Sequence, residues 1–98
     1  MYARVVTWEG GEADAIRTAT DEIASRAASG PPEGVPSVGF TLLRDPEAGR
    51  VLAIGLFETE EDLNTAAAVL NEMTPPGEGM GERSSVDVFE VAFDLRVD

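Results

Sequence analysis

The sequence predicts one α+β domain in which strands and helices follow in the order β-α-β-β-α-β. Three observations predict it: four runs rich in β-branched and aromatic residues, two stretches with apolar residues at helical spacing, and Gly- or Pro-rich breaks between them. The 98 residues are enough for one domain and too few for two. We therefore expect a single domain over residues 1–98.

The first expected strand covers residues 2–8, where β-branched and aromatic side chains favour extended backbone. Two glycines, Gly10 and Gly11, end it. Because side chains alternate between the faces of a strand, one face carries Tyr2, Arg4, Val6 and Trp8.

The first expected helix covers residues 12–29, with acidic residues in its first turn, where the helix dipole favours negative charge. Its apolar stripe holds two isoleucines and otherwise small residues, so it buries little by itself and can leave room beside a sheet. The stripe consists of Ile16, Ala19, Thr20, Ile23 and Ala27.

Two strands are expected at residues 37–44 and 50–58, around a turn that contains Asp45, Pro46 and Gly49. The short connection favours an antiparallel hairpin whose two faces are both mostly apolar, so both need cover. We expect one face to carry Val38, Phe40 and Leu42 with Leu52, Ile54 and Leu56, and the other to carry Thr41 and Leu43 with Val51, Ala53 and Phe57.

A second helix is expected at residues 60–71, with Thr59 as its N-cap and Asp62 three residues later. A last strand is expected at residues 84–95, where Asp87 interrupts the more apolar face. The order of elements predicts a ferredoxin-like fold: a four-stranded antiparallel sheet with both helices on one face. The uncovered apolar face predicts a homodimer, in which two sheets pack face to face into an α/β barrel.

The charge and the absent residue types exclude whole classes of function. The formal net charge is −12, from 19 acidic and 7 basic residues, so nucleic acids and anionic membranes are not expected partners. The N-terminus lacks a signal-peptide pattern and no apolar run is long enough to cross a bilayer, so a cytoplasmic protein is expected.

The chain contains no Cys, His or Lys. Disulfides, thiolate catalysis, Cys-based metal sites, the usual haem ligand and lysine Schiff bases are thereby excluded. We expect no metal and no cofactor. The remaining chemistry must use carboxylates, hydroxyls, Asn, Arg, Tyr2 or Trp8.

Residues 1–10, 49–61 and 86–91 carry patterns by which the sequence resembles the dimeric α/β-barrel superfamily, and within it small proteins like the antibiotic biosynthesis monooxygenases. The resemblance covers nearly the whole chain. It implies the fold expected above and a choice of activities: cofactor-free oxygenation of polycyclic aromatic compounds, haem degradation or isomerisation. Haem-degrading members use a helix His, which this chain lacks, whereas the cofactor-free oxygenases use Asn, Trp, Tyr and Arg.

The candidate ligand-binding residues are Tyr2, Arg4 and Trp8 on one strand face and Asn64 on the second helix. A phenol and a guanidinium can stabilise a phenolate, an indole stacks on a flat ligand, and an amide can bind a carbonyl. The alternatives are sheet packing, with Arg4 paired to an acid, and an exposed Asn64 with Asn71 ending the helix. No catalytic residue is predicted.

Three functions remain open from the sequence. The first is a dimer that binds a flat or aromatic small molecule between helices and sheet. The second is a cofactor-independent monooxygenase of phenolic or polyketide-like substrates, and the third is a structural or regulatory dimer with a protein partner. Whether the chain is an enzyme stays open.

Overall fold

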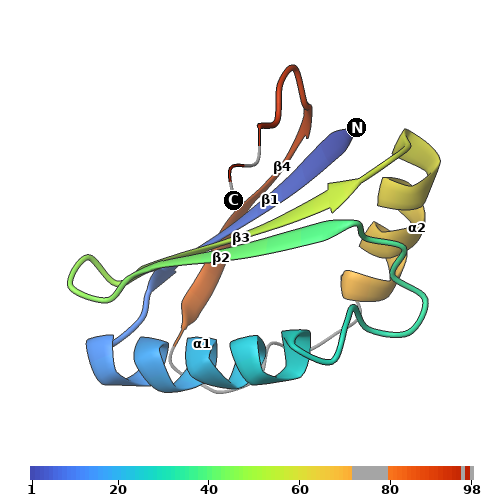
Figure 1. The fold of residues 1–98 in the computed structure, drawn as a ribbon. Helices are drawn as coiled ribbons and strands as arrows, with labels where there is room; N and C mark the ends of the chain where they lie inside the picture. The colour runs from blue at the N-terminus through green and yellow to red at the C-terminus, as the bar shows by residue number, and fades with distance from the viewer. Residues whose placement is uncertain (72–79, 96, 98) are drawn as a thin grey trace.

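The computed structural model describes residues 1–71, 80–95 and 97, and it confirms the predicted order of elements. The strands form one antiparallel sheet in the order β2-β3-β1-β4, and Figure 1 shows both helices on the same side of it. This is the expected ferredoxin-like fold. The elements are β1 (Tyr2–Gly10), α1 (Ala13–Ala27), β2 (Gly39–Asp45), β3 (Arg50–Phe57), α2 (Glu60–Leu70) and β4 (Gly81–Glu90).

The last strand differs from its expected bounds at both ends. It begins at Gly81, which pairs with Gly10 at the end of β1, and it ends at Glu90, which pairs with Tyr2 at the start of β1. One further bond, from the Val91 N–H to the Met1 carbonyl, follows. Because β4 has only β1 as a neighbour, its length follows the length of β1.

The expected faces of the β2–β3 hairpin are wrong. Asp45 pairs with Arg50 across the loop of residues 46–49, so even-numbered residues of β2 face odd-numbered residues of β3. Turn length sets this register, and a shift by one residue exchanges the faces. The helix-facing side carries Phe40 and Leu42 with Val51, Ala53 and Phe57, and the outer side carries Thr41 and Leu43 with Leu52, Ile54 and Leu56.

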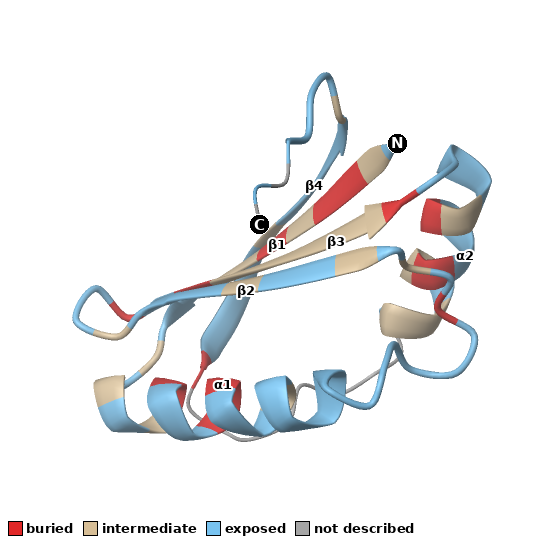
Figure 2. Ribbon diagram, viewed as in Figure 1, coloured by how far each residue is buried: buried red, intermediate tan, exposed pale blue. Residues whose placement is uncertain are grey.

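The apolar core consists of two clusters, one under each helix (Figure 2). The first contains Ile16, Ala19, Val51 and Met80 and joins α1 to β3. The second contains Val35, Phe57, Leu63 and Ala66 and joins α2 to the other end of β3.

The two helices are fixed to the sheet over different parts of their length. α1 buries only its first half, where the Thr20 hydroxyl also donates to the Ile16 carbonyl over 2.6 Å, whereas Ala27 at its end is exposed. α2 begins at the expected cap, since the Thr59 hydroxyl accepts from the Asp62 N–H over 3.1 Å. Within the described ranges, no helix is both long and apolar enough to cross a membrane.

Replacement of Phe57 should show how strongly the second cluster holds the fold. Phe57 is 1% exposed, so Phe57→Ala should lower the free energy of unfolding by about 3–5 kcal/mol through lost burial and a residual cavity. Phe40→Ala is the matched control because Phe40 lies on the same face of the sheet but is 47% exposed. Urea unfolding at one protein concentration measures both, and equal losses would contradict this description of the core.

Candidate functional site

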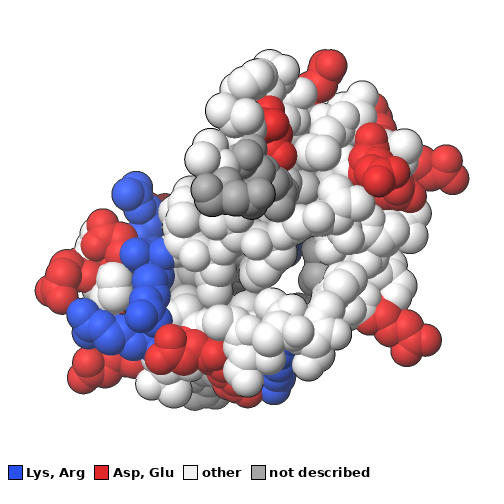
Figure 3. All heavy atoms as spheres, in the orientation of Figure 1, with Lys and Arg blue, Asp and Glu red and all other residues white. Residues whose placement is uncertain are grey.

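A cavity of about 1090 Å³ lies between the sheet and the helices, in the space that separates the two core clusters. Figure 3 shows the molecule hollowed there, with an uncharged surface around the hollow and charged groups toward the ends of the molecule. Small-molecule sites typically enclose about 300–1000 Å³ with mostly apolar walls, so this volume suffices for a ligand of several rings. The walls include Trp8, Ile23, Phe40, Leu42, Ala53 and Leu70.

Small residues and the short anchorage of α1 keep this space open. Beyond Thr20 the stripe of α1 continues through Ile23 to Ala27, which reach the cavity but do not fill it. On the sheet, Ala53 and Gly55 give a floor with almost no side-chain volume. The helical stripe of small residues that the sequence predicts on α1 therefore forms one wall of the cavity at its C-terminal end.

Three polar side chains meet on one wall of the cavity: Arg4 of β1, Asn71 at the end of α2 and Arg83 of β4. The Arg4 Nη2 donates to Asn71 Oδ1 over 2.9 Å, and the Arg83 Nη1 donates to the same oxygen over 3.1 Å. We refer to Arg4, Asn71 and Arg83 as the arginine cluster. One neutral amide oxygen thus holds two guanidinium groups together.

A register shift in the β1–β4 pairing places Arg83 in this cluster. The pairs run regularly to Thr7 and Ser85, and Trp8 then faces Arg83, so Ser84 is skipped in the register and only its hydroxyl donates to the Thr7 carbonyl over 3.3 Å. A bulge of this kind re-aims the side chains beyond it. Plain alternation along β4 puts Arg83 on the outer face with Asp87, and therefore its place on the cavity wall could not be predicted from the sequence.

The electrostatics of the arginine cluster are unusual for so acidic a chain. Burial lowers the pKa of the Arg4 guanidinium below its ordinary value, and the positive charge of Arg83 lowers it further. The described residues that line the cavity include no Asp or Glu. The third arginine of the walls, Arg26, donates to Glu22 over 2.7 Å and is neutralised there.

Two of the candidate residues lie on the cavity wall and two do not. Arg4 and Trp8 line it, as their shared strand face predicted. Tyr2, two residues before Arg4 on the same face of β1, packs against the second core cluster. Asn64 is exposed on α2. The alternative in which Arg4 pairs with an acid is not found among the described residues.

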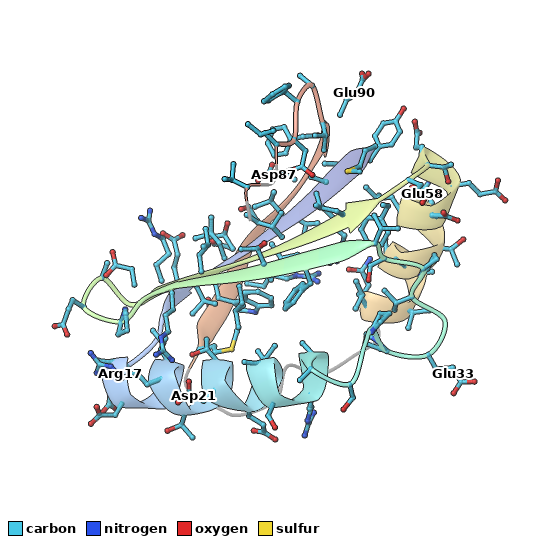
Figure 4. The ribbon with its side chains drawn as sticks, in the orientation of Figure 1. Arg17, Asp21, Glu33, Glu58, Asp87 and Glu90 are labelled. Atoms are coloured by element: carbon cyan, nitrogen blue, oxygen red, sulfur yellow. The ribbon has the colours of Figure 1, made fainter. Side chains whose placement is uncertain are left out.

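The sequence predicted Asn64 as the ligand-binding amide and Asn71 only as the end of the second helix. In the structure, Asn71 is the amide that lines the cavity. Seven residues along an α-helix return to nearly the same face but rise by roughly 10 Å. Asn64 and Asn71 therefore point in similar directions at different levels of α2, and only the C-terminal level meets the cavity. Asp87, opposite Val5 in the middle of β1, and Glu90, opposite Tyr2 at its start, are both exposed, and Figure 4 shows both away from α1.

This fold is similar to that of a haem degrader. MhuD from Mycobacterium tuberculosis, solved with two haems bound in its active site, matches with a TM-score of 0.68 and 22% identity over 98% of this chain and 100% of that chain. A single-residue mutant of MhuD, solved with two manganese protoporphyrin IX molecules per active site, matches with a TM-score of 0.66 and 20% identity over 99% and 100%.

These matches confirm the ferredoxin-like fold that the sequence predicts. No protein-family model matches the sequence, and no curated protein does. At this identity, what the similar structures bind is a property of those proteins.

Haem is the group that this fold suggests, and the residues of the cavity do not fit iron-bound haem. The sequence has no His, Cys or Lys. Met80 is the only thioether among the described lining residues, and it is 2% exposed because it packs in the first core cluster. Asn71 Oδ1 already accepts two hydrogen bonds. In the described part of the chain, no three His, Cys, Asp or Glu residues gather in a way that could hold a metal ion.

The hydrogen bonds of Asn71 can be tested against those of Asn64 on the same helix. Asn71→Ala removes the acceptor of both arginines and leaves two guanidiniums side by side, so it should cost about 1–2 kcal/mol of unfolding free energy. Asn64→Ala removes an exposed side chain and should change stability by less than about 0.5 kcal/mol. Chemical denaturation of both variants measures the difference, and equal effects would show that the amide does not hold the cluster.

Proposed function

We propose that this chain is a homodimeric protein that binds a flat aromatic small molecule between its sheet and its helices. The observation that carries the proposal is the cavity itself, with its volume of about 1090 Å³ and its mostly apolar walls. Ligand sites in proteins combine such walls with a few converging polar groups, which the arginine cluster supplies here.

The shape of the cavity favours a planar ligand. A sheet floor of Ala53 and Gly55 offers a level surface, and the rings of Trp8 and Phe40 lie on the same side of the sheet. Aromatic rings stack on such surfaces and gain about 0.5–1.5 kcal/mol per pair beyond simple burial. The similar solved structures hold porphyrins, which are also planar, in their active sites.

A cofactor-independent monooxygenase is the second candidate, and the arginine cluster favours it. Two guanidiniums stabilise a phenolate or enolate, the electron-rich form in which such compounds react with oxygen. With anthrone the reaction balances as anthrone plus O₂ to anthraquinone plus water, so O₂ is the only oxidant needed. Oxygen uptake with anthrone that is lost in Arg83→Gln supports this candidate, and no uptake with bound anthrone counts against it.

The outer face of the sheet supports the homodimer. Its side chains are mostly apolar on β1, β2 and β3, and Leu43 of β2 (47%) and Phe89 of β4 (55%) are exposed, whereas Ser85 and Asp87 make the β4 edge of this face polar. Beyond β4, Phe93, Leu95 and Val97 are exposed as well. Exposed apolar area of this extent marks an interaction surface, and a second copy offers the same surface. The net charge of −12 makes contact through the charged surface unfavourable.

Ligand binding should raise the melting temperature and should depend on the open cavity. Anthraquinone-2-carboxamide at about 100 times its dissociation constant should add about 2.7 kcal/mol of stability in a thermal-shift assay. Ala53→Phe places a ring on the cavity floor and should abolish the shift. Ala68→Phe adds the same ring on the exposed side of α2 and should retain it. A shift that survives Ala53→Phe would place the ligand elsewhere.

The dimer should depend on the outer face of β2 and not on its helix-facing side. Leu43→Asp introduces a charge on the outer face and should yield monomers in size-exclusion chromatography with light scattering. Phe40→Asp is the matched control, because Phe40 has the same 47% exposure on the other face of β2. A monomeric wild type, or a dimer unaffected by Leu43→Asp, would refute this assembly.

A further inference from the structure

We propose that the arginine cluster is an oxyanion site, which holds a carboxylate or phenolate oxygen of the ligand against the apolar cavity. The inference rests on the proposed function, since it names the chemical class of the aromatic molecule bound there. The ligand is then an aromatic acid with one deprotonated oxygen group at one edge of its ring system.

Arg4 is the first reason, because it is a buried cation with no counterion among residues 1–71, 80–95 and 97. It is 7% exposed, it lines the cavity, and its one described side-chain hydrogen bond goes to the neutral oxygen of Asn71. Its Nε is buried and has no acceptor among the described residues. A buried guanidinium normally lies against a carboxylate, and the described part of the chain supplies none to Arg4, which leaves its charge and its Nε–H without a partner there.

Arg83 is the second reason, because it adds a like charge to the same place. Two guanidiniums converge on one amide oxygen, and their charges repel, which is one cause of the lowered pKa of Arg4. A bound anion turns this repulsion into two attractive contacts. Hydrogen bonds from arginine to an oxyanion are shorter and roughly twice as strong as neutral ones.

The distribution of acids is the third reason. Acidic residues outnumber arginines in this chain by 19 to 7, and Arg17, Arg26 and Arg44 all bind carboxylates. The described cavity wall nevertheless lacks any acid, and the acidic side chains visible in Figure 3 lie toward the ends of the molecule. The wall therefore offers a positive potential inside a negative protein, and this selects an anion over a neutral molecule of the same shape.

The test compares two ligands of nearly equal size, of which one carries a negative charge and the other is neutral. Anthraquinone-2-carboxylate and anthraquinone-2-carboxamide share a ring system and differ in charge, and fluorescence or calorimetric titration gives both dissociation constants. The carboxylate should bind wild type at least about tenfold more tightly, which corresponds to about 1.4 kcal/mol. Arg83→Gln should reduce this preference to less than about threefold, with little change for the amide.

Arg83 is the residue of choice because it is exposed on an edge strand, so its replacement leaves the core intact. Arg26→Gln is the matched control, since Arg26 lines the same cavity but already pairs with Glu22. It should keep the full preference for the carboxylate.

Each outcome decides one point. Equal affinity of wild type for both ligands overturns the oxyanion site and leaves the aromatic cavity standing. Binding of neither ligand overturns the proposed function itself. A preference that survives Arg83→Gln but falls in Arg26→Gln overturns the assignment to the arginine cluster.

Discussion

The contact between the first half of α1 and β3 is the anchor on which the rest of the interior depends. Ile16 and Ala19 press on Val51, and this contact fixes one end of the helix to the sheet. The second half has no comparable residue, so it spans the space toward α2 without closing it. Close packing is the default of protein interiors, and the cavity exists because the helix has too little apolar volume to achieve it.

The cavity and the outer face follow from one sheet that is apolar on both sides. On the inner side, two helices cover the sheet at its ends and leave a gap between them. On the outer side no helix or described strand packs on the apolar residues of β1 and β3, among which Ala3 is buried and Val5, Leu52, Ile54 and Leu56 are half-buried. A domain of this size buries only about 60–70% of its unfolded surface, so pairing of two outer faces adds burial where it is most needed.

Most of the fold was predictable from the sequence, because periodicity and turn residues are local signals. The element order, the capping of α2 by Thr59 and the shared face of Arg4 and Trp8 all rest on neighbours along the chain. The faces of the β2–β3 hairpin could not be predicted in this way, since they depend on the number of residues in the turn between the two strands. A single residue decides that register.

The candidate site was predictable only in part, for a related reason. Asn64 and Asn71 are equivalent in helical phase, and only the packing of the whole domain distinguishes their levels along α2. Arg83 reaches the wall through an irregularity in strand pairing that leaves no clear mark in the sequence. Local patterns thus predicted the strand and the face that carry Arg4, but they did not predict that Asn71 and Arg83 lie beside it.

The bulge at Ser84 shifts the alternation of β4 side chains between the two faces of the sheet by one residue. Beyond it, Arg83 faces the helices with Trp8 and Glu82 faces outward with Glu9. An uninterrupted strand would exchange the two and put a carboxylate beside the cavity. The sign of the charge on this wall is therefore set by the bulge and not by the composition of β4. Pairing of Ser84 with Trp8 would invert the sign with every residue retained, whereas deletion of Ser84 would remove the bulge and leave Arg83 opposite Trp8.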